Sequence, residues 1–297
     1  MPIIAAAGIP SVGNNATSSA ENTSPLSFLG VFAIPAFIGQ ITSAASLGAK
    51  SIVLAVIDIP AVGFAVNIAE KAAAAYGIKA TVVPVPPTAT DMSPIAAQIL
   101  SLKPDVLIPV TGGPQVEGLI KSLVQQGADF KKKIKFIQDF VVLTPLLAHR
   151  VGAKLMDGLY STGVTWSPTD TSNPGIKLYL AELKAGRQPA GATDVSSLGI
   201  LGWASVHLVA DALTGQKELT AATVVKRLNT KGAIDTTKYA LAPIDYTKPA
   251  IPKDKVLSTL RIFTHFTSFW RFDNKGIPHP VAKSWIDVFH KFKVPGA

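Results

Sequence analysis

The sequence predicts an α/β protein in which parallel strands alternate with helices. Short runs rich in Val and Ile begin at Ser51, Lys79, Asp105 and Ile134, about 27 residues apart. Runs that are apolar throughout are typical of strands buried on both faces. Apolar residues with helical spacing fill the intervals, in residues 61–77, 93–103 and 113–127, and an earlier helix is predicted at residues 36–47, before the first run. Strands and helices that alternate in this way predict βαβ units, and hence a parallel sheet flanked by helices.

A different pattern follows residue 165. Three helices are predicted in succession, at residues 173–186, 195–215 and 220–229, and no strand separates them. Asn173 and Thr220 are the expected N-caps of the first and third of these helices. Helices without intervening strands do not continue the same sheet, so they indicate a second lobe. The tail at residues 266–290 alternates on both sides of Asp273–Gly276, which predicts a hairpin.

Composition excludes several classes of protein. The chain has 297 residues, of which 48% are hydrophobic and 16% charged, as in a globular protein with ample core. It contains no apolar run long enough to span a membrane, and the first Lys or Arg is Lys50, so no signal peptide is recognisable in this chain. The absence of Cys excludes disulfides, thiol catalysis and zinc–thiolate sites.

The net charge of +9 raises the question of nucleic-acid binding. The basic residues are scattered, and only residues 130–136 (FKKKIKF) form a run. This run is typical of a solvated turn before the strand at Ile134. We therefore expect no nucleic-acid partner.

Signatures of catalysis are missing. The sequence has no nucleophile elbow, no Walker phosphate loop, no HExxH motif and no GxGxxG motif. The five histidines show no metal-ligand spacing. We expect no catalytic residues, no metal site and no cofactor.

Candidate binding residues follow the predicted strands, because ligands of open parallel sheets bind beyond the carboxyl ends of the strands. The rule selects the loops at 58–62, 84–91, 110–114 and 138–142. Thr111, Gly112 and Gly113 precede a helix, where a ligand can approach the backbone; the alternative is a tight turn. Asp139 could hold a ligand ammonium, or could be an exposed loop acid.

A polar cluster near the start of the chain is a further candidate. Asn14, Asn15, Ala16 and Thr17 follow a short predicted strand at Ile9–Val12. Amides, hydroxyls and free backbone groups are suited to a ligand carboxylate. A polar surface turn is the alternative interpretation.

Several segments in order resemble one family. They read GIPSVGNNATS (residues 8–18), TDMSPIAAQILSLKPDVLI (90–108), GLYSTGVTW (158–166) and GWASVHLVADAL (202–213). The chain resembles the type I periplasmic solute-binding proteins of ABC transporters, in the branch that binds leucine, isoleucine, valine or related amides. The resemblance covers nearly all of the chain. It implies two α/β lobes, each a parallel sheet flanked by helices, that are joined by three crossovers and close on a ligand.

The resemblance also implies a division of the chain. Residues 1–27 would be a remnant of the amino-terminal lobe, 28–160 the carboxyl-terminal lobe, 161–240 the helices of the amino-terminal lobe, and 241–297 a β-rich return to the carboxyl-terminal lobe. Family members carry about a hundred further residues before the segment that matches GIPSVGNNATS. We therefore expect an incomplete amino-terminal lobe.

The family's binding positions carry over in part. Asn15, Ala16 and Thr17 match its carboxylate loop, and Asp139 falls near an acid that holds the ligand ammonium. Val62 stands where the family often has an aromatic residue. Thr111, Gly112 or Gly113 replaces a common Tyr. Because of these departures the identity of the ligand stays open: it could be an amino acid, an amide, an aromatic acid or a carboxylate without an amine.

The function expected from the resemblance is that of a non-catalytic receptor of an ABC importer. It would bind a small molecule between two lobes and deliver it to a membrane permease in the periplasm or another extracytoplasmic space. The alternatives are a cytoplasmic ligand sensor of the same fold, a nucleotide-dependent α/β enzyme, and a truncated chain that binds nothing.

Overall fold

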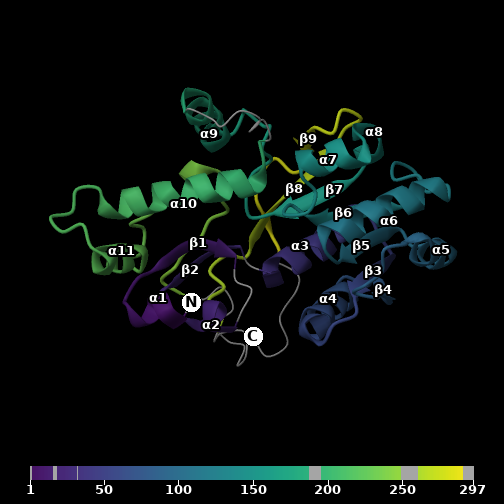
Figure 1. The fold of residues 1–297 in the computed structure, drawn as a ribbon, viewed down its shortest axis with the longest axis horizontal. Helices are drawn as coiled ribbons and strands as arrows, with labels where there is room; N and C mark the ends of the chain where they lie inside the picture. The colour runs from purple at the N-terminus through teal and green to yellow at the C-terminus, as the bar shows by residue number, and fades with distance from the viewer. Residues whose placement is uncertain (1, 16–18, 32, 187–194, 249–259, 290–297) are drawn as a thin grey trace. The chain divides into compact units, whose positions relative to one another are not determined.

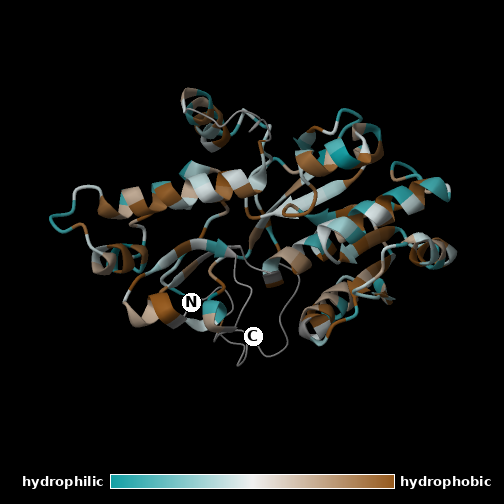
Figure 2. Ribbon diagram, in the orientation of Figure 1, coloured by the Kyte–Doolittle hydropathy of each residue, from teal (hydrophilic) through white to brown (hydrophobic). Residues whose placement is uncertain are grey.

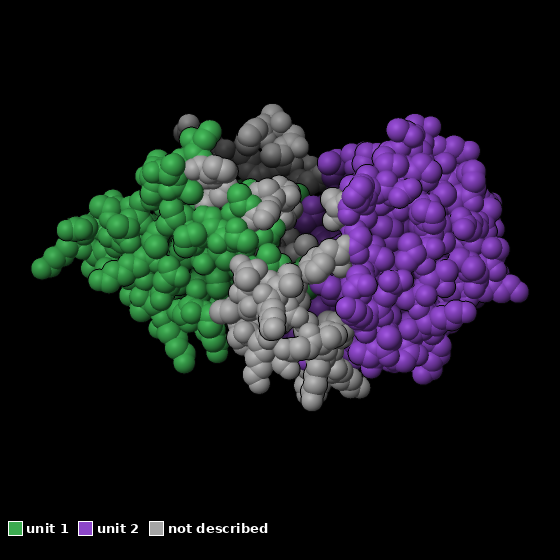
Figure 3. Space-filling view, turned by 90° about the horizontal axis from the view of Figure 1, so that it is seen from below, with its two compact units in different colours: residues 1–35, 164–267, 293–297 green, residues 36–163, 268–292 purple. Residues whose placement is uncertain are grey.

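The computed structural model describes residues 2–15, 19–31, 33–186, 195–248 and 260–289 (Figure 1). The chain forms two compact units, which are coloured separately in Figure 3. Unit 1 comprises residues 1–35, 164–267 and 293–297, and unit 2 comprises residues 36–163 and 268–292. No helix in the described ranges is long and apolar enough to cross a membrane.

Unit 2 is built on one mixed sheet with the strand order β10-β8-β7-β6-β5-β3-β4. The four predicted strand runs are confirmed as β3 (Ser51–Ile57), β4 (Lys79–Val85), β5 (Val106–Val110) and β6 (Lys135–Asp139), and β7 (Tyr160–Gly163) continues the parallel array. β8 (Phe266–Phe272) pairs antiparallel with β7. The central strands β3 and β5 are buried over most of their length, as their continuous Val and Ile content predicts.

Helix α3 (Ala33–Ser46) precedes β3, and α4 (Gly63–Ala75), α5 (Ser93–Ser101) and α6 (Gly113–Gln125) connect β3 to β6 in succession. Helices α7 (Pro145–Val151) and α8 (Ala153–Met156) lie between β6 and β7. Figure 2 shows apolar and polar residues mixed along α4 and α6, as expected for helices that bury one face. The strand-helix alternation predicted from the sequence is therefore confirmed.

The order of the strands creates a switch point between β3 and β5. The chain leaves β3 for β4 on one side, then returns to place β5 on the other side of β3. Open α/β sheets bind ligands in the crevice outside the carboxyl ends of the strands at such a point.

Unit 1 contains a two-stranded parallel sheet, β1 (Ser11–Asn15) with β2 (Ser27–Val31), together with the short helices α1 (Pro2–Ala6) and α2 (Ser19–Thr23). The three predicted helices are confirmed as α9 (Pro174–Ala185), α10 (Ser197–Leu213) and α11 (Ala221–Leu228). The Asn173 and Thr220 side chains cap α9 and α11 as expected. A 3₁₀ turn, η2 (Thr236–Tyr239), follows α11.

Helix α10 packs closely on the sheet of unit 1. Gly13 has a left-handed backbone with φ of 75°, and a Cβ built there would lie 1.6 Å from Ser205 Oγ on α10. A Cβ on Gly30 would lie 2.5 Å from Leu201 Cδ1. These glycines allow the close approach of helix and strands.

The expected strand at Ile9–Val12 was misplaced. β1 runs from Ser11 to Asn15, so Asn14 and Asn15 belong to the strand and not to a loop after it. The parallel pairing with β2 continues to Asn15 opposite Val31 and outweighs the low strand propensity of Asn.

The tail contains the predicted hairpin. β8 pairs antiparallel with β9 (Pro278–Pro280), and the Asp273 carboxylate accepts hydrogen bonds from the backbone N–H groups of Lys275 and Ile277 in the turn. β10 (Ile286–Asp287) ends the described tail.

The division of the chain into lobes that the resemblance implies stays a prediction. Residues 28–35 and 241–267 lie in unit 1. Backbone hydrogen bonds tie residues 241–267 to other parts of this unit: Ala242 N–H donates to Val164 O, and Arg261 N–H donates to Asn22 O.

Candidate ligand-binding site

The carboxyl edge of the unit 2 sheet gathers most of the candidate residues. Val62 follows β3, Thr111–Gly113 follow β5, and Asp139 ends β6. β3, β5 and β6 are adjacent and parallel, so these positions share one edge of the sheet.

The turn between β5 and α6 leaves a helix N-terminus open. Gly112 is the N-cap residue, and no side chain caps the helix. Neither Gly112 nor Gly113 has a positive φ, and a Cβ on Gly113 would meet no atom within 4 Å. The glycines are therefore not required by a left-handed turn. Their effect is to leave space beside the N-terminus of α6, where a negative charge is favoured; Gly113 and Gln115 have backbone N–H groups there, and Pro114 between them has none.

Thr111 is tied into the same turn. Its hydroxyl is hydrogen-bonded to Gln115 Oε1, and Gln115 Nε2 donates to the carbonyl oxygens of Pro86 and Pro87, at 3.3 and 3.1 Å. The loop after β4 is thus fixed to the start of α6. Thr111 positions this turn, and its hydroxyl already has a partner.

Asp139 is the most perturbed acid of this edge. Val141 N–H donates to Asp139 Oδ1 at 2.8 Å, and no cation among the described residues forms an ion pair with the carboxylate. Although the residue keeps some accessible surface, burial of the carboxyl group raises its pKa to about 7. Acids with pKa values perturbed in this way are concentrated at functional sites.

Thr162 was not predicted as a site residue. It lies opposite Asp139 on the adjacent strand β7, and its buried hydroxyl has no hydrogen-bond partner in the described structure. The only sequence signal was its position within GLYSTGVTW, which does not reveal which face of β7 it occupies. Asp139 and Thr162 together offer a carboxyl and a hydroxyl on one face of the sheet.

The other face of the same strand ends is also polar. Gln138 Oε1 accepts from Asp139 N–H at 2.6 Å and from Gln40 Nε2 on α3 at 3.5 Å. Ser161 lies opposite Gln138, and both Ser161 Oγ and Gln40 Oε1 are buried without a partner in the described residues. Each such atom costs about 1–3 kcal/mol unless water or a ligand satisfies it. Unsatisfied polar groups of this kind indicate a functional or hydrated region.

Val62 is separated from the other candidates. It lies in the 3₁₀ turn η1 (Pro60–Val62) and lines a pocket of about 410 Å³ between β3, α4 and β4. None of Thr111, Gly112, Gly113 or Asp139 lines that pocket. The pocket lies on the β4 side of β3, whereas the turn at Thr111–Gly113 follows β5 on the other side.

The amino-terminal candidates lie in unit 1. Asn14 Nδ2 donates to Ser27 Oγ at 3.3 Å, and Asn14 Oδ1 is buried without a partner in the described part of the chain. Asn15 ends β1. Ala16 and Thr17 lie outside the described residues.

No group of three or more His, Cys, Asp or Glu side chains in the described ranges is arranged to hold a metal ion. His207, for example, is bound to Glu182 through Nε2 at 2.9 Å and stacks on Tyr239, with ring centroids 4.8 Å apart.

Comparison with known proteins settles the family. Residues 1–255 match the family model described as periplasmic binding protein. The chain belongs to the periplasmic binding protein family. Comparison with curated protein sequences gives no match.

Solved structures with the same fold are distant in sequence. A solute-binding protein of an ABC transporter from Rhodopseudomonas palustris HaA2, in complex with p-hydroxybenzoic acid, has a TM-score of 0.74 at 20% identity; the match covers 98% of this chain and 75% of that chain. A branched-chain amino acid ABC transporter protein from Thermus thermophilus, with bound valine, has a TM-score of 0.69 at 17% identity. The match covers 98% of this chain and 76% of that chain. A fatty acid ABC transporter substrate-binding protein from Thermomonospora curvata has a TM-score of 0.72 at 16% identity. The match covers 96% of this chain and 71% of that chain.

The expected fold is thereby confirmed as the α/β fold of two-lobed periplasmic binding proteins. Proteins of this family bind small molecules and work with the permeases of ABC transporters. They are solute-binding proteins, so this chain is a binding protein and not an enzyme.

Proposed function

We propose that this chain is the extracytoplasmic receptor of an ABC importer and binds an amino acid, an amide or a related small carboxylate. Asp139 carries the proposal. It is a buried acid with no cation beside it among the described residues, at the edge of the sheet where the fold class binds ligands.

Chemistry shared by the structural neighbours supports a carboxylate-bearing ligand. The names of three of them specify valine, p-hydroxybenzoic acid and fatty acid, and each of these molecules has a carboxyl group. In unit 2, the open N-terminus of α6 offers backbone N–H groups of the kind that bind such a group.

Asp139 supports two modes of recognition with opposite pH dependence. An ammonium ligand requires the ionised carboxylate, so its affinity should fall about tenfold per pH unit below pH 7. A carboxylate without an amine requires the protonated acid as a hydrogen-bond donor. Its affinity should fall as the pH rises above about 7.

A thermal-shift screen with matched ligands tests this function, since a ligand of the folded state raises Tm. The set is valine, isovalerate, valinamide and 4-hydroxybenzoate, each at pH 6 and pH 8. We expect one class to raise Tm with dose, and the effect to lose its pH dependence in Asp139→Asn. Glu218→Gln, an exposed acid outside the site, is the control. A response that is equal at both pH values contradicts the role of Asp139.

A further inference from the structure

Lysines gather at the amino ends of the parallel strands of unit 2. They precede or begin β3, β4, β5 and β6, and they comprise Lys50, Lys79, Lys103, Lys132, Lys133 and Lys135. We call these lysines the basic edge. They are scattered along the sequence, but the amino ends of parallel strands meet at one edge of a sheet, so the topology brings them to one side of unit 2.

The opposite edge of the same sheet has the reverse charge. No Lys or Arg lies in the loops that follow β3 to β6, at residues 58–62, 86–92, 111–112 and 140–144. Asp58 and Asp91 lie in these loops, and Asp139 ends β6. The two edges of the sheet therefore differ in charge, with lysines at the amino ends of the strands and acids at the carboxyl ends.

Backbone hydrogen bonds make the basic edge continuous. Lys79 N–H donates to Lys50 O at 2.9 Å, which joins the starts of β4 and β3. Asp105 N–H donates to Ser51 O at 3.2 Å, and Lys135 N–H donates to Asp105 O at 2.8 Å, so β5 is joined to β3 and β6 to β5. Neighbouring strands lie about 4.8 Å apart, so the four strand starts form a row roughly 15 Å long.

The charges of the basic edge are available to a partner. Its lysines are exposed except Lys135, which is half-buried, and none of them forms an ion pair in the described part of the chain. The acids in the same segments are Asp105 and Asp129. Both accept hydrogen bonds from backbone N–H groups, and neither is paired with a lysine ammonium group among the described residues.

The helix ends beside this edge do not explain the lysines. A cation can offset the negative carboxyl-terminal end of a helix, but this effect is confined to the last turn. None of α3, α4, α5 and α6 has a basic residue in its last turn. The lysines of the basic edge lie beyond those turns, so compensation of the helix dipoles does not account for them.

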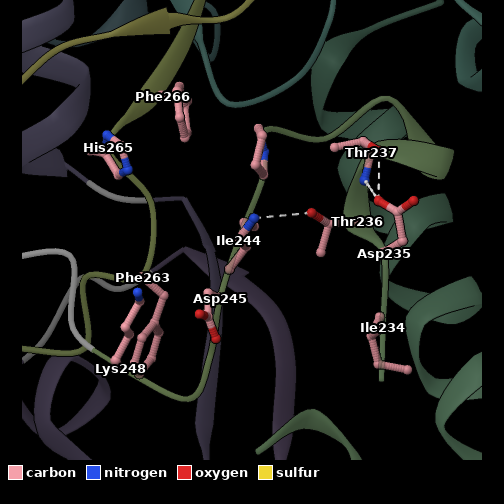
Figure 4. A pocket seen from close by; sticks show the side chains of 11 residues that line it. Ile234, Asp235, Thr236, Thr237, Ile244, Asp245, Lys248, Phe263, His265 and Phe266 are labelled. Atoms are coloured by element: carbon pink, nitrogen blue, oxygen red, sulfur yellow. Dashed lines mark hydrogen bonds between the residues drawn. The ribbon is translucent and has the colours of Figure 1, made fainter. Parts of the chain in front are cut away.

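The pocket of unit 1 in Figure 4 lacks such a concentration of one charge. It has a volume of about 440 Å³, and its lining includes Asp235, Asp245 and Lys248. Each Asp is held in its own turn by the backbone N–H and the hydroxyl of a Thr two residues later. Figure 4 shows the two carboxylates on separate segments of the chain. The basic edge of unit 2 is the stronger candidate for a charged partner.

Two features of the basic edge favour a lipid bilayer over a nucleic acid. Leu102 is 45% exposed beside Lys103, and an apolar side chain next to a lysine can enter the boundary between lipid headgroups and acyl chains. The rings nearest to Lys132, Phe130 and Phe136, are buried, so they cannot stack on a base as in proteins that bind single strands. A row of exposed lysines without such rings fits a plane of anionic headgroups.

We propose that the basic edge docks on a bilayer that contains anionic phospholipid, with the lysines against the lipid phosphates and Leu102 at the headgroup boundary. This interaction goes beyond the proposed receptor function. Its test requires no transported ligand, so either proposal can fail while the other holds.

Sedimentation of the full chain with vesicles tests the docking. One set of vesicles contains phosphatidylglycerol and phosphatidylcholine, and the other contains phosphatidylcholine alone. We expect at least tenfold tighter binding to the anionic vesicles in about 0.05 M NaCl. The difference should vanish in about 1 M NaCl, where the Debye length falls to about 3 Å. Equal binding to the two sets in low salt, or no binding to the anionic set, would overturn the proposal.

Charge-matched variants locate the binding surface. A lysine near an anionic membrane contributes roughly fivefold to affinity, so Lys132→Gln/Lys133→Gln should weaken binding at least tenfold. Lys71→Gln/Lys217→Gln removes the same charge from exposed positions outside the basic edge and should change binding less than twofold. Melting curves should be the same for both double variants. Equal losses of affinity would overturn the assignment, because binding would then follow net charge alone.

Two competitors distinguish the bilayer from other anions. Glycerol 3-phosphate supplies the phosphate without a surface, and we expect it to displace the chain from vesicles no more than NaCl of equal ionic strength. A short DNA duplex should bind more weakly than the anionic vesicles. Specific displacement by glycerol 3-phosphate would reassign the lysines to a soluble phosphate. Tighter binding of the duplex, lost in Lys132→Gln/Lys133→Gln, would reassign them to a nucleic acid, and either result overturns the proposal.

Discussion

Asp139 and Thr162 lie opposite each other at the carboxyl ends of the parallel strands β6 and β7. The carboxyl group is buried without a cation beside it among the described residues, and the buried Thr162 hydroxyl has no partner there. A buried carboxyl group without a cation and a buried hydroxyl without a hydrogen-bond partner are both costly in a folded protein. This free-energy cost is offset if a ligand or ordered water forms the missing hydrogen bonds.

The stability of the ligand-free chain should depend on Asp139. Its pKa is raised from 3.8 to about 7, so the protonated form is favoured in the folded state. The contribution to stability is present in full below about pH 4 and is lost as the pH rises to about 7. Asp139→Asn should therefore stabilise the chain at pH 8, by up to about 4 kcal/mol, and have little effect at pH 4.

Urea unfolding of both proteins at the two pH values measures this difference. Asn can still accept the hydrogen bond from Val141 N–H, so the local turn is preserved. A variant that is destabilised equally at both pH values would mean that the carboxylate is not desolvated.

Gly163 at the end of β7 should not tolerate a side chain. A Cβ there would lie 2.2 Å from Cδ1 and 2.5 Å from Cγ of Phe140, the residue after Asp139. Gly163→Ala should displace the ring, destabilise unit 2 by about 1–3 kcal/mol and weaken ligand binding. Gly202→Ala on α10 is the matched control, because a Cβ there meets nothing within 4 Å. The control should be neutral or stabilising. Equal Tm values for the two variants would refute the steric argument.

Gly13 and Ser205 should be energetically coupled. Gly13→Ala adds a Cβ at 1.6 Å from Ser205 Oγ and at a positive φ, so we expect a loss of several kcal/mol. Ser205→Gly removes the collision and leaves the backbone strain. The double variant should recover part of the loss in a double-mutant cycle of unfolding free energies. Strict additivity of the two changes would show that α10 does not approach β1 this closely.

Tyr239 should stabilise unit 1 through its hydroxyl. It donates to Asp211 Oδ2 at 2.8 Å, and burial together with Asp211 raises the pKa of Tyr239 to about 12. Tyr239→Phe should cost roughly 1–2 kcal/mol, because Asp211 loses its donor. In an Asp211→Ala background the same change should cost much less. If Tyr239→Phe lowers the unfolding free energy by the same amount in that background, the loss comes from packing against Trp203 and His207 and not from the hydrogen bond.

Local sequence patterns were sufficient for most of the fold. Val- and Ile-rich runs located β3 to β6, and the caps at Asn173 and Thr220 located two helices. The pattern failed at β1, since pairing with β2 draws Asn14 and Asn15 into a strand. Local propensity does not contain that tertiary contribution.

Residues of the candidate site could be predicted from the sequence only where a loop directly follows a strand. Thr111–Gly113 and Asp139 were selected by that rule, and their contact with a ligand stays a prediction. Thr162 and Gln40 were not, because their relation to Asp139 and Gln138 depends on strand register and on a contact between residues 98 positions apart. Val62 was placed by resemblance, and whether it touches the ligand stays a prediction.

Proton exchange during ligand binding is the most direct test of the proposed receptor function. The measurement is calorimetric titration at pH 7, with the best ligand of the screen, in two buffers of different ionisation enthalpy. We predict proton release for an ammonium ligand, or proton uptake for a carboxylate without an amine, and no exchange in Asp139→Asn. Binding without any proton exchange in the unmodified chain would contradict the assignment of Asp139 to the ligand site.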